Sequence, residues 1–338
     1  MKGWKPSPGE PNGVGVLPQP VQLPLGLPGY EHQGKRRGLE PFIGESPALL
    51  AELENIEAAA RYDVTVLIVA ETGTGKELVA HAVHGMSKRG GKPLVTYNCS
   101  SLAGPLADDK LFGHVRGAFT GADAAAPGLV EEAEGGVLFL DEINSCPKGT
   151  QGLLLRLLDN GEFYRVGCAK VRKANVRIIA ATNVDLAQPV SEGKFREDLF
   201  FRLNLQVLTM PPLRFRKEDI PLLARHFMEK FAHDYGEKGK RLLPEAMAKL
   251  LRSDWPGNVR ELHNTLVSAW ICSKHPWIGA EHVSLKERDA SLPPSLAAFL
   301  AEQRKTYIQR VVETCGGDVA AATRIAGITS RHFRRLRG

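Results

Sequence analysis

The sequence predicts an α/β fold in which helices cover a parallel sheet, followed by a smaller helical subdomain and a separate all-α tail. From Pro41 onward, short apolar runs rich in β-branched residues alternate with amphipathic stretches, as in a parallel sheet with helices on both faces. After Pro211-Pro212 the strand signals stop, and residues 219–285 show the apolar spacing of helices. A basic block at residues 296–338 also has the pattern of short helices.

The predicted elements alternate along most of the chain. Strands are expected at Val64–Ala70, Leu94–Tyr97, Val137–Leu140, Val176–Ala181 and Gln206–Met210. Helices are expected between them at Leu49–Ala60, Glu77–Ser87 and Gln151–Asn160. The helical subdomain is expected to hold Ile220–Tyr235, Pro244–Ser253 and Asn258–Lys274. The alternation predicts repeated units of a strand, a turn and a helix.

Changes in composition predict five segments. Residues 1–40 hold seven prolines and eight glycines and are expected to be disordered, because they lack a periodic apolar pattern. The α/β subdomain is expected at 41–214, the helical subdomain at 215–285, a linker at 286–295 and the tail at 296–338. The first segment leaves no room for a folded sensory domain, so we expect control by a separate regulatory protein, by expression level or by self-assembly.

Composition excludes several classes of protein. The hydrophobic share of 43% and the charged share of 24% are ordinary for a soluble globular protein. No apolar run approaches the ~20 residues of a transmembrane helix, so a cytoplasmic protein without a membrane partner is expected. The five cysteines are far apart and show no C-x-x-C spacing, which argues against a disulfide framework or a zinc site.

The net charge of +6 is concentrated in the tail. Residues 291–338 hold eight Lys/Arg and three acids, so they contribute +5, and the first 290 residues carry the remaining +1. A small basic unit on a near-neutral body predicts a polyanionic partner for that unit.

A glycine-rich turn joins the first predicted strand to the next helix. It consists of Glu71, Thr72, Gly73, Thr74, Gly75, Lys76 and Glu77. In such a turn the backbone N–H groups converge on phosphate oxygens, the lysine adds a positive charge, and the helix N-terminus adds its dipole. The strict Walker A pattern has a first glycine where this chain has Ala70, and a hydroxyl residue where it has Glu77. Taken alone, the segment also fits an ordinary glycine turn.

A second element favours nucleotide chemistry. The run Gly135–Glu142 is an apolar strand that ends in Asp141 and Glu142. Asp141 at this place is expected to hold Mg²⁺, directly or through water, and Glu142 is expected to polarise an attacking water. Two solvated carboxylates at a strand end are the alternative, but the phosphate-type turn ~65 residues upstream is a usual spacing for this architecture.

These elements resemble a AAA+ ATPase with a P-loop core and a helical lid. Between them lies the hexapeptide GAFTGA, which consists of Gly117, Ala118, Phe119, Thr120, Gly121 and Ala122. It follows Leu111-Phe112-Gly113-His114, as it does in the sigma-54-dependent transcriptional activators, and this resemblance covers about residues 40–285. In that family the loop projects from a ring of subunits and engages sigma-54. Its two glycines allow shape change at low cost, and its tip presents one aromatic ring.

The resemblance assigns further roles residue by residue. Asn98, after the second predicted strand, matches the asparagine that holds the catalytic glutamate, here Glu142. Thr182 and Asn183 match sensor I, which detects the γ-phosphate. Arg260, in the run Trp255–Leu262, matches the sensor II arginine of the lid.

Two arginines match the arginine fingers of the family. Arg196 and Arg202 would be supplied by a neighbouring subunit and would stabilise charge in the transition state. They imply a ring-shaped homo-oligomer, a hexamer as in the family. Ordinary surface ion pairs are the alternative for both side chains.

Three departures from the family pattern bear on these roles. Ala70 would weaken nucleotide binding if the family glycine at that place needs a positive φ. Glu77 is usual in the family, whereas Val115-Arg116 replaces its Glu-Lys. In the family's R-V-G turn, Arg165 and Gly167 are present and Cys168 replaces the second glycine.

The tail has the pattern of a helix-turn-helix. Leu296–Cys315 is expected to be an amphipathic helix, Val319–Ala326 a second, and a third is expected to begin at Thr329 or Ser330 after the turn at Gly327. This arrangement resembles the Fis-type module of the family, and a basic capping helix is the alternative. The residues expected to contact double-stranded DNA at an upstream site are Thr329, Ser330, Arg331, His332, Arg334 and Arg335.

The resemblance implies an ATPase that uses ATP and Mg²⁺ to convert the closed complex of sigma-54 RNA polymerase holoenzyme into an open one. Two alternatives stay open at this point. A AAA+ remodelling machine, such as an unfoldase or helicase loader, shares the nucleotide elements without needing GAFTGA or a DNA-binding tail. A DNA-binding regulator without hydrolysis would follow if Ala70 disables the phosphate turn.

Overall fold

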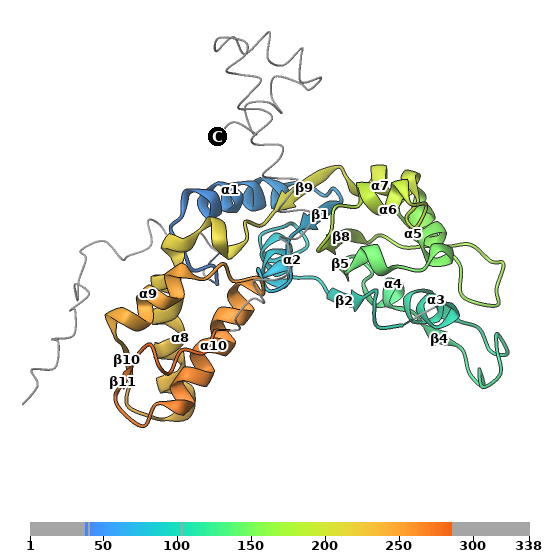
Figure 1. The fold of residues 1–338 in the computed structure, drawn as a ribbon. Helices are drawn as coiled ribbons and strands as arrows, with labels where there is room; N and C mark the ends of the chain where they lie inside the picture. Colours follow the sequence, from blue (N-terminus) through green and yellow to red (C-terminus); the bar gives the residue numbers. More distant parts are fainter. Residues whose placement is uncertain (1–37, 40, 103, 286–338) are drawn as a thin grey trace, which may run out of the picture. The chain divides into compact units, whose positions relative to one another are not determined.

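The computed structural model describes residues 38–39, 41–102 and 104–285, and within them it shows the predicted α/β architecture (Figure 1). Five strands form one parallel sheet in the order β2-β5-β8-β1-β9. They are β1 (Val66–Val69), β2 (Leu94–Asn98), β5 (Val137–Asp141), β8 (Arg177–Thr182) and β9 (Gln206–Thr209). Each lies within two residues of its predicted run, because a strand buried on both faces is a short continuous apolar segment.

Helices cover both faces of this sheet, and alternate residues of each strand serve the two faces. On one face, Leu138 and Leu140 of β5 pack into a core shared with the later helices. On the other face, Val137 and Phe139 pack against the helices that begin the described chain. The helices are α1 (Pro47–Arg61), α2 (Lys76–Gly85), α3 (Pro105–Phe112), α4 (Leu129–Glu132), α5 (Lys148–Asn160), α6 (Ala187–Ser191) and α7 (Glu197–Leu203).

Two small antiparallel pairs extend from this core. β3 (Gly113–His114) pairs with β4 (Ala126–Pro127), and β6 (Glu162–Phe163) pairs with β7 (Arg172–Lys173). Both pairs lie between elements of the large sheet in sequence, and neither has a counterpart among the predicted strands. Each has only two residues per strand, which is too short for a period-2 pattern to show.

The helical subdomain follows β9. The 3-10 turns η2 (Leu213–Phe215) and η3 (Lys217–Asp219) lead into α8 (Ile220–Tyr235), α9 (Pro244–Arg252) and α10 (Asn258–Cys272). A short parallel pair, β10 (Arg241–Leu242) with β11 (Trp277–Ile278), joins the loops at the far end of these helices. The three predicted helices are confirmed, and α8 has its predicted bounds.

The remaining predictions about organisation lie partly outside the described residues. The chain divides into two compact units after Ser284, and the predicted linker and helix-turn-helix fall beyond the described part. The proposed segment boundaries stay predictions. Cys99, Cys146, Cys168 and Cys272 are free thiols, and no group of three or more potential metal ligands is found within the described residues.

Candidate functional site

The phosphate-type turn lies between β1 and α2. Gly73 and Gly75 have φ of +80° and +108°, which only glycine adopts without strain, and α2 begins directly afterwards at Lys76. Ala70 is buried, its N–H donates to the carbonyl of Thr182 at 3.0 Å, and its φ is not positive. Position 70 therefore does not need the conformational freedom of glycine, and alanine causes no backbone strain there.

Lys76 and Asp141 meet at the carboxyl edge of the sheet. The Lys76 Nζ lies 3.4 Å from Asp141 Oδ1, and both side chains are largely shielded from solvent. Asp141 Oδ1 also accepts from the Glu142 N–H at 2.9 Å. One carboxylate beside a phosphate-binding lysine fits Mg²⁺, which commonly takes one or two protein carboxylates and completes its shell with nucleotide phosphates and water.

Glu142 and Asn98 lie on adjacent strand ends without a direct hydrogen bond. Glu142 has a φ of +52° and precedes the short turn η1 (Ile143–Ser145). Asn98 is the register partner of Asp141, and its Oδ1 accepts from the N–H and hydroxyl of Ser100 at 2.8 and 2.7 Å. Asn98 is therefore placed one strand away from the carboxylates of Asp141 and Glu142 but bonds to Ser100 in this structure.

The sensor I position is tied to the strand end that carries the acids. Thr182 ends β8 and is fully buried, and its hydroxyl lies 3.1 Å from Asn144 Oδ1 and 3.0 Å from the Val184 carbonyl. Asn183 follows and is exposed. Asn144, two residues after Glu142, was not predicted as a site residue because it belongs to no motif used in the sequence reasoning.

The helical subdomain holds the phosphate turn through an ion pair. Arg214 donates to both carboxylate oxygens of Glu71, at 2.7 and 2.6 Å. These hydrogen bonds hold the pKa of Glu71 below its usual range, against the opposing effect of partial burial. Glu71 was predicted as a nucleotide-binding residue, but the structure shows its side chain turned to Arg214.

Asn258 makes a second link between the lid and the turn. It is buried with a φ of +53°, and its Nδ2 donates to the Thr72 carbonyl at 3.1 Å and to Glu71 Oε2 at 3.2 Å. The Arg260 N–H donates to the Gly73 carbonyl at 3.3 Å. A side chain at Gly73 would collide with the Gly257 carbonyl, so glycine is needed there for the close approach of the lid as well. Asn adopts a positive φ more readily than most residues, which fits Asn258 at this helix start.

A cavity of about 590 Å³ joins these groups. Residues 72–77, Asp141 and Glu142 line one end, and Phe42, Ile43, Leu223 and Phe227 give the other an apolar lining. Charged groups at one end and apolar groups at the other fit a nucleotide, with phosphates at the turn and the base toward the lid.

Arg216 is an unexpected member of the cavity wall. Its side chain is buried, its Nε has no hydrogen-bond partner, and burial lowers its pKa from the usual range. Its neighbour Asp219 is satisfied separately, by the N–H groups of Glu45 and Ser46 and by the Ser46 hydroxyl. The sequence carried no signal for this residue, since an arginine between two helical turns is normally exposed.

The GAFTGA segment forms a turn between β3 and β4, and in Figure 1 it extends beyond α3 at the edge of the ribbon. Gly117 and Gly121 have φ of +81° and +96°. The Gly117 N–H donates to the Ala122 carbonyl at 2.8 Å, and the Ala122 N–H donates to the Phe119 carbonyl at 3.0 Å. Phe119 is 43% exposed at the tip, which is high for an aromatic side chain.

The R-V-G turn packs against this segment. Gly167, with φ of +78°, lies so close to Ala118 that an added Cβ would be 2.7 Å from the Ala118 Cβ. Arg165 makes a bidentate ion pair with Glu131 at 2.8 Å for both contacts. Cys168 has no positive φ, so the missing second glycine is not required by the backbone.

Residues 42–209 match the Sigma-54 interaction domain family, and residues 214–297 match the AAA+ ATPase lid domain family. The Alginate biosynthesis transcriptional regulatory protein AlgB of Pseudomonas putida is 42% identical over 304 residues, covering 89% of this chain and 68% of that protein. The chain belongs to the sigma-54-dependent activator family of AAA+ proteins.

Other relatives and solved structures agree. The Transcriptional regulatory protein ZraR of Escherichia coli is 43% identical over 293 residues, covering 86% of this chain and 66% of that protein. The DNA-binding transcriptional regulator NtrC of Escherichia coli is 49% identical over 242 residues, covering 70% and 52%. Crystal structures of NtrX from Brucella abortus, in complex with ADP and with ATP, superimpose with TM-scores of 0.68 and 0.67 at 33% identity. They cover 87% of this chain and 68% of theirs. The chain thus spans about two thirds or less of ZraR and NtrC.

The two arginines that match the fingers of this family lie away from the nucleotide cavity of their own chain. Arg196 pairs with Asp198 at 2.7 Å and Arg202 pairs with Asp159 at 2.6 Å, with side chains 47% and 58% exposed. Neither lines the cavity described above. Within the single chain, both arginines form surface ion pairs, which is the alternative given for them from the sequence. A role in the nucleotide site of a neighbouring subunit stays a prediction.

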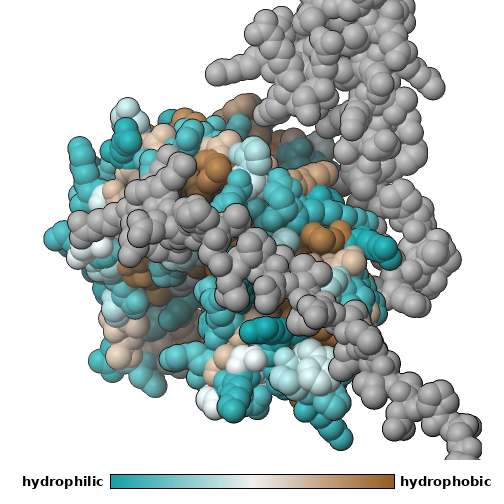
Figure 2. Space-filling model, turned by 90° about the vertical axis from the view of Figure 1, so that its left-hand side faces the viewer, coloured by the Kyte–Doolittle hydropathy of each residue, from teal (hydrophilic) through white to brown (hydrophobic). Residues whose placement is uncertain are grey.

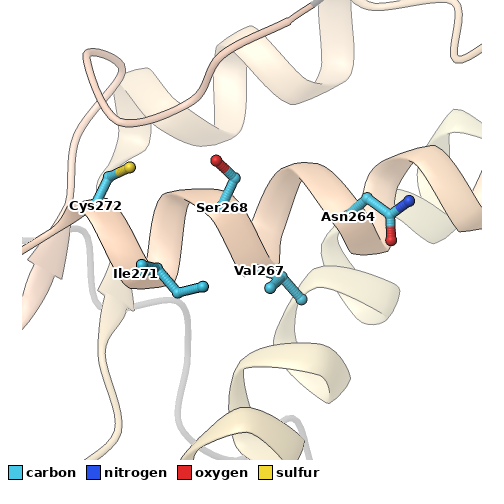
Figure 3. Close-up of a pocket in the computed structure, with 5 residues that line it drawn as sticks. All are labelled: Asn264, Val267, Ser268, Ile271 and Cys272. Atoms are coloured by element: carbon cyan, nitrogen blue, oxygen red, sulfur yellow. The ribbon is translucent and has the colours of Figure 1, made fainter.

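Two surface features complete the described part of this family member. The face that carries the lid is mostly hydrophilic, with separate hydrophobic patches (Figure 2). One face of α10 lines a hollow of about 330 Å³ with Asn264, Val267, Ser268, Ile271 and Cys272 (Figure 3).

No helix of the described residues is long and apolar enough to span a membrane. The predicted DNA-contacting residues, from Thr329 to Arg335, lie outside the described residues.

Proposed function

We propose that this chain is an ATP-hydrolysing transcription activator that remodels the closed complex of sigma-54 RNA polymerase holoenzyme into an open complex. The observation that carries the proposal is the pairing of Lys76 with Asp141 beneath a lid, in the same subdomain that presents the GAFTGA loop with Phe119 exposed. Such a protein acts in the cytoplasm and needs ATP and Mg²⁺.

The residues divide the chemistry among them. The turn at residues 71–77 and Lys76 bind the phosphates, Asp141 holds Mg²⁺, and Glu142 polarises the attacking water. Bound Mg²⁺ supplies charge neutralisation at the phosphates. Asn98 exchanges its contact with Ser100 for one with Glu142 and so couples the nucleotide state to the loop. Thr182, with its buried hydroxyl, and Asn183 report on the γ-phosphate.

A ring of subunits completes the site. Arg196 and Arg202 are exposed and do not reach their own cavity, which supports their use in trans by a homo-oligomer, a hexamer as in the family. Arg260 approaches the nucleotide from the lid, since its N–H already contacts Gly73. The exposed Phe201 and Leu205, on and just after α7, add apolar area beside the two arginines for such an interface.

The tail and the control of the protein complete the proposal. The basic block at 296–338 binds an upstream double-stranded DNA site through Thr329, Ser330, Arg331, His332, Arg334 and Arg335. Control comes from a separate regulatory protein, from expression level or from self-assembly.

The direct test is ATP-dependent open-complex formation. Purified protein at high concentration is mixed with sigma-54 holoenzyme and a pre-melted promoter probe, so that no specific upstream site is needed. Stable opening with ATP, none with a non-hydrolysable analogue, and none with Lys76→Ala would support the proposal. Hydrolysis without opening, even with a known activator succeeding in parallel, would favour the remodelling alternative.

The backbone at Ala70 argues against the other alternative, a DNA-binding regulator without hydrolysis. The backbone there is compatible with alanine, and Lys76, Asp141 and Glu142 are all present. Steady-state phosphate release across a range of protein concentrations tests this directly. No turnover at any concentration would restore that alternative.

A further inference from the structure

His114 occupies the base of the GAFTGA loop and has two polar partners. Its Nδ1 lies 2.6 Å from Asp109 Oδ1 of α3, and its Nε2 lies 2.9 Å from the Ala124 carbonyl on the returning arm of the loop. The His114 side chain is 15% exposed and that of Asp109 is 25% exposed. One side chain therefore joins α3 to both arms of the loop.

The two partners determine which atoms donate. A carboxylate and a carbonyl are both acceptors, so a ring nitrogen of His114 that carries a proton can donate to the partner it faces. The contact with Asp109 is then charge-assisted, and such hydrogen bonds are about twice as strong as neutral ones. The ring is held by this pair in one orientation.

The third contact of this ring is the tip of the loop. The His114 and Phe119 ring centroids are 5.0 Å apart with an interplanar angle of 64°, an edge-to-face arrangement. It is the one ring contact of Phe119 within the described residues. An edge-to-face arrangement of two aromatic rings is favourable, because the edge of one ring meets the electron-rich face of the other.

Little else in the loop fixes the Phe119 ring. Around Gly117 and Gly121, the space where a Cβ would point is empty to 4 Å, so the backbone there is not packed against the body. The hydrogen bonds of Gly117 and Ala122 close the turn on itself, and at its base the Val115 N–H donates to the Val166 carbonyl at 3.1 Å. Ala118 packs against Gly167, but Phe119 extends past that contact.

We propose that His114 is a positioning residue that holds Phe119 in a defined orientation at the loop tip, through Asp109 on one side and the Ala124 carbonyl on the other. The inference rests on the proposed role of Phe119 in contacting sigma-54. It adds that His114 holds the Phe119 ring in place and that the Asp109 carboxylate orients His114.

The test uses the full chain with 4-fluorophenylalanine introduced at position 119 alone and observed by ¹⁹F NMR. The native resonance is expected to differ from that of the same protein unfolded in denaturant. His114→Gln keeps a polar side chain but removes the ring, and should move the resonance to the unfolded value. The matched control is His233→Gln, which alters another His–Asp pair, an exposed one on the lid 3.1 Å from Asp234, and should leave the resonance unchanged.

A second readout connects the placement to activity. Open-complex formation by His114→Gln should fall by about tenfold, the factor that loss of one charge-assisted hydrogen bond allows. Asp109→Asn keeps an acceptor without the charge, and should produce an intermediate ¹⁹F shift and an intermediate loss. If His114→Gln does not fold, Asp109→Asn carries the test alone.

The outcomes separate this inference from the proposed function. An unchanged ¹⁹F resonance in folded His114→Gln, or in folded Asp109→Asn when the histidine variant does not fold, overturns the positioning role. A shifted resonance in a protein whose wild type never opens promoters supports the placement and overturns the proposed function instead. Equal losses of opening in the His114 and His233 variants would also overturn the inference.

Discussion

The nucleotide site and the GAFTGA loop are held by different kinds of contact. At the nucleotide site, side chains from β1–α2, β5, η2 and α10 converge on one turn, and the contacts include the ion pairs of Lys76 with Asp141 and of Arg214 with Glu71. In the loop, the contacts are mostly backbone hydrogen bonds within the turn itself, with His114 and Gly167 at its base.

This difference matches what each region has to do. Catalysis benefits from charges that are already placed, because no reorganisation is then needed when the transition state forms. A loop that follows the nucleotide state must change shape at small cost, and two glycines with positive φ allow that. Substitutions in the two regions should therefore separate hydrolysis from promoter opening.

The largest effect is expected at Arg196, which we propose completes the nucleotide site of a neighbouring subunit. Arg196→Ala should lower the ATP turnover number by roughly 10³-fold or more, because an arginine finger stabilises transition-state charge. Steady-state phosphate release measures this, with Arg61→Ala, an exposed arginine at the end of α1, as the control. Mixing Arg196→Ala with Lys76→Ala subunits should restore part of the activity, since some junctions then combine two intact halves. No recovery on mixing, with mixed rings verified, would place the arginine in its own site.

A smaller loss is expected for the catalytic carboxylate. Glu142→Gln should lower the turnover number by about 10²- to 10⁴-fold, the range for a missing general base, and should leave nucleotide binding in place. Phosphate release and the binding of a fluorescent ATP analogue measure the two properties. Glu132→Gln, an exposed glutamate on α4, serves as the control. Turnover close to that of wild type would remove Glu142 from the mechanism.

The loop should respond in the opposite way. Phe119→Ala should reduce open-complex formation by roughly 30-fold or more, as for an interface aromatic worth at least ~2 kcal/mol, while ATP turnover changes by less than about twofold. The pre-melted probe assay and phosphate release are measured on the same preparation. Leu106→Ala, another exposed apolar residue, on α3, is the control. Equal losses of both activities would contradict the separation of the two regions.

Sequence reasoning predicted the fold and the charged residues of the site because both follow from local patterns. The five strands of the sheet are continuous apolar runs, Asp141 and Glu142 come at the end of one of them, and Lys76 follows the glycine turn after another. The glycines at 73 and 75 were identified by their spacing, and the structure gives them the positive φ that explains it. Parallel strands bring their carboxyl ends to one edge, so motifs far apart in sequence had to meet there.

The residues that were missed act over long sequence distances. Arg214 lies 143 residues from Glu71, and Asn258 lies 186 residues from Thr72. No periodic pattern or motif connects such pairs, because their contact depends on how the lid packs. Arg216 was missed for a related reason, since its burial appears only after η2 and η3 fold against residues 45–46.

The smallest effect is expected for the ion pair between the lid and the phosphate turn. The pKa of Glu71 is held below its ordinary value of 4.5, chiefly by hydrogen bonds from Arg214. A carboxyl group with a lowered folded-state pKa stabilises the fold above its unfolded pKa, and this contribution is lost as the pH falls through the folded value. Wild type should therefore lose more stability than Glu71→Gln on acidification below about pH 5, by less than about 1 kcal/mol because the pair is partly exposed.

A second carboxylate–arginine pair, outside the nucleotide site, serves as the comparison for the ion pair of Glu71. Asp63 is also bound in bidentate fashion, by Arg89 at 2.9 and 2.7 Å, and its pKa is also lowered by that arginine. Urea unfolding against pH should thus give similar acid sensitivity for the removal of either carboxylate. The KM for ATP should rise several-fold only in Glu71→Gln, because only Glu71 lies in the phosphate turn. If the two variants have equal KM values for ATP, the ion pair of Arg214 with Glu71 stabilises the fold but does not contribute to nucleotide binding. The phosphate turn would then keep its conformation without this contact from the lid.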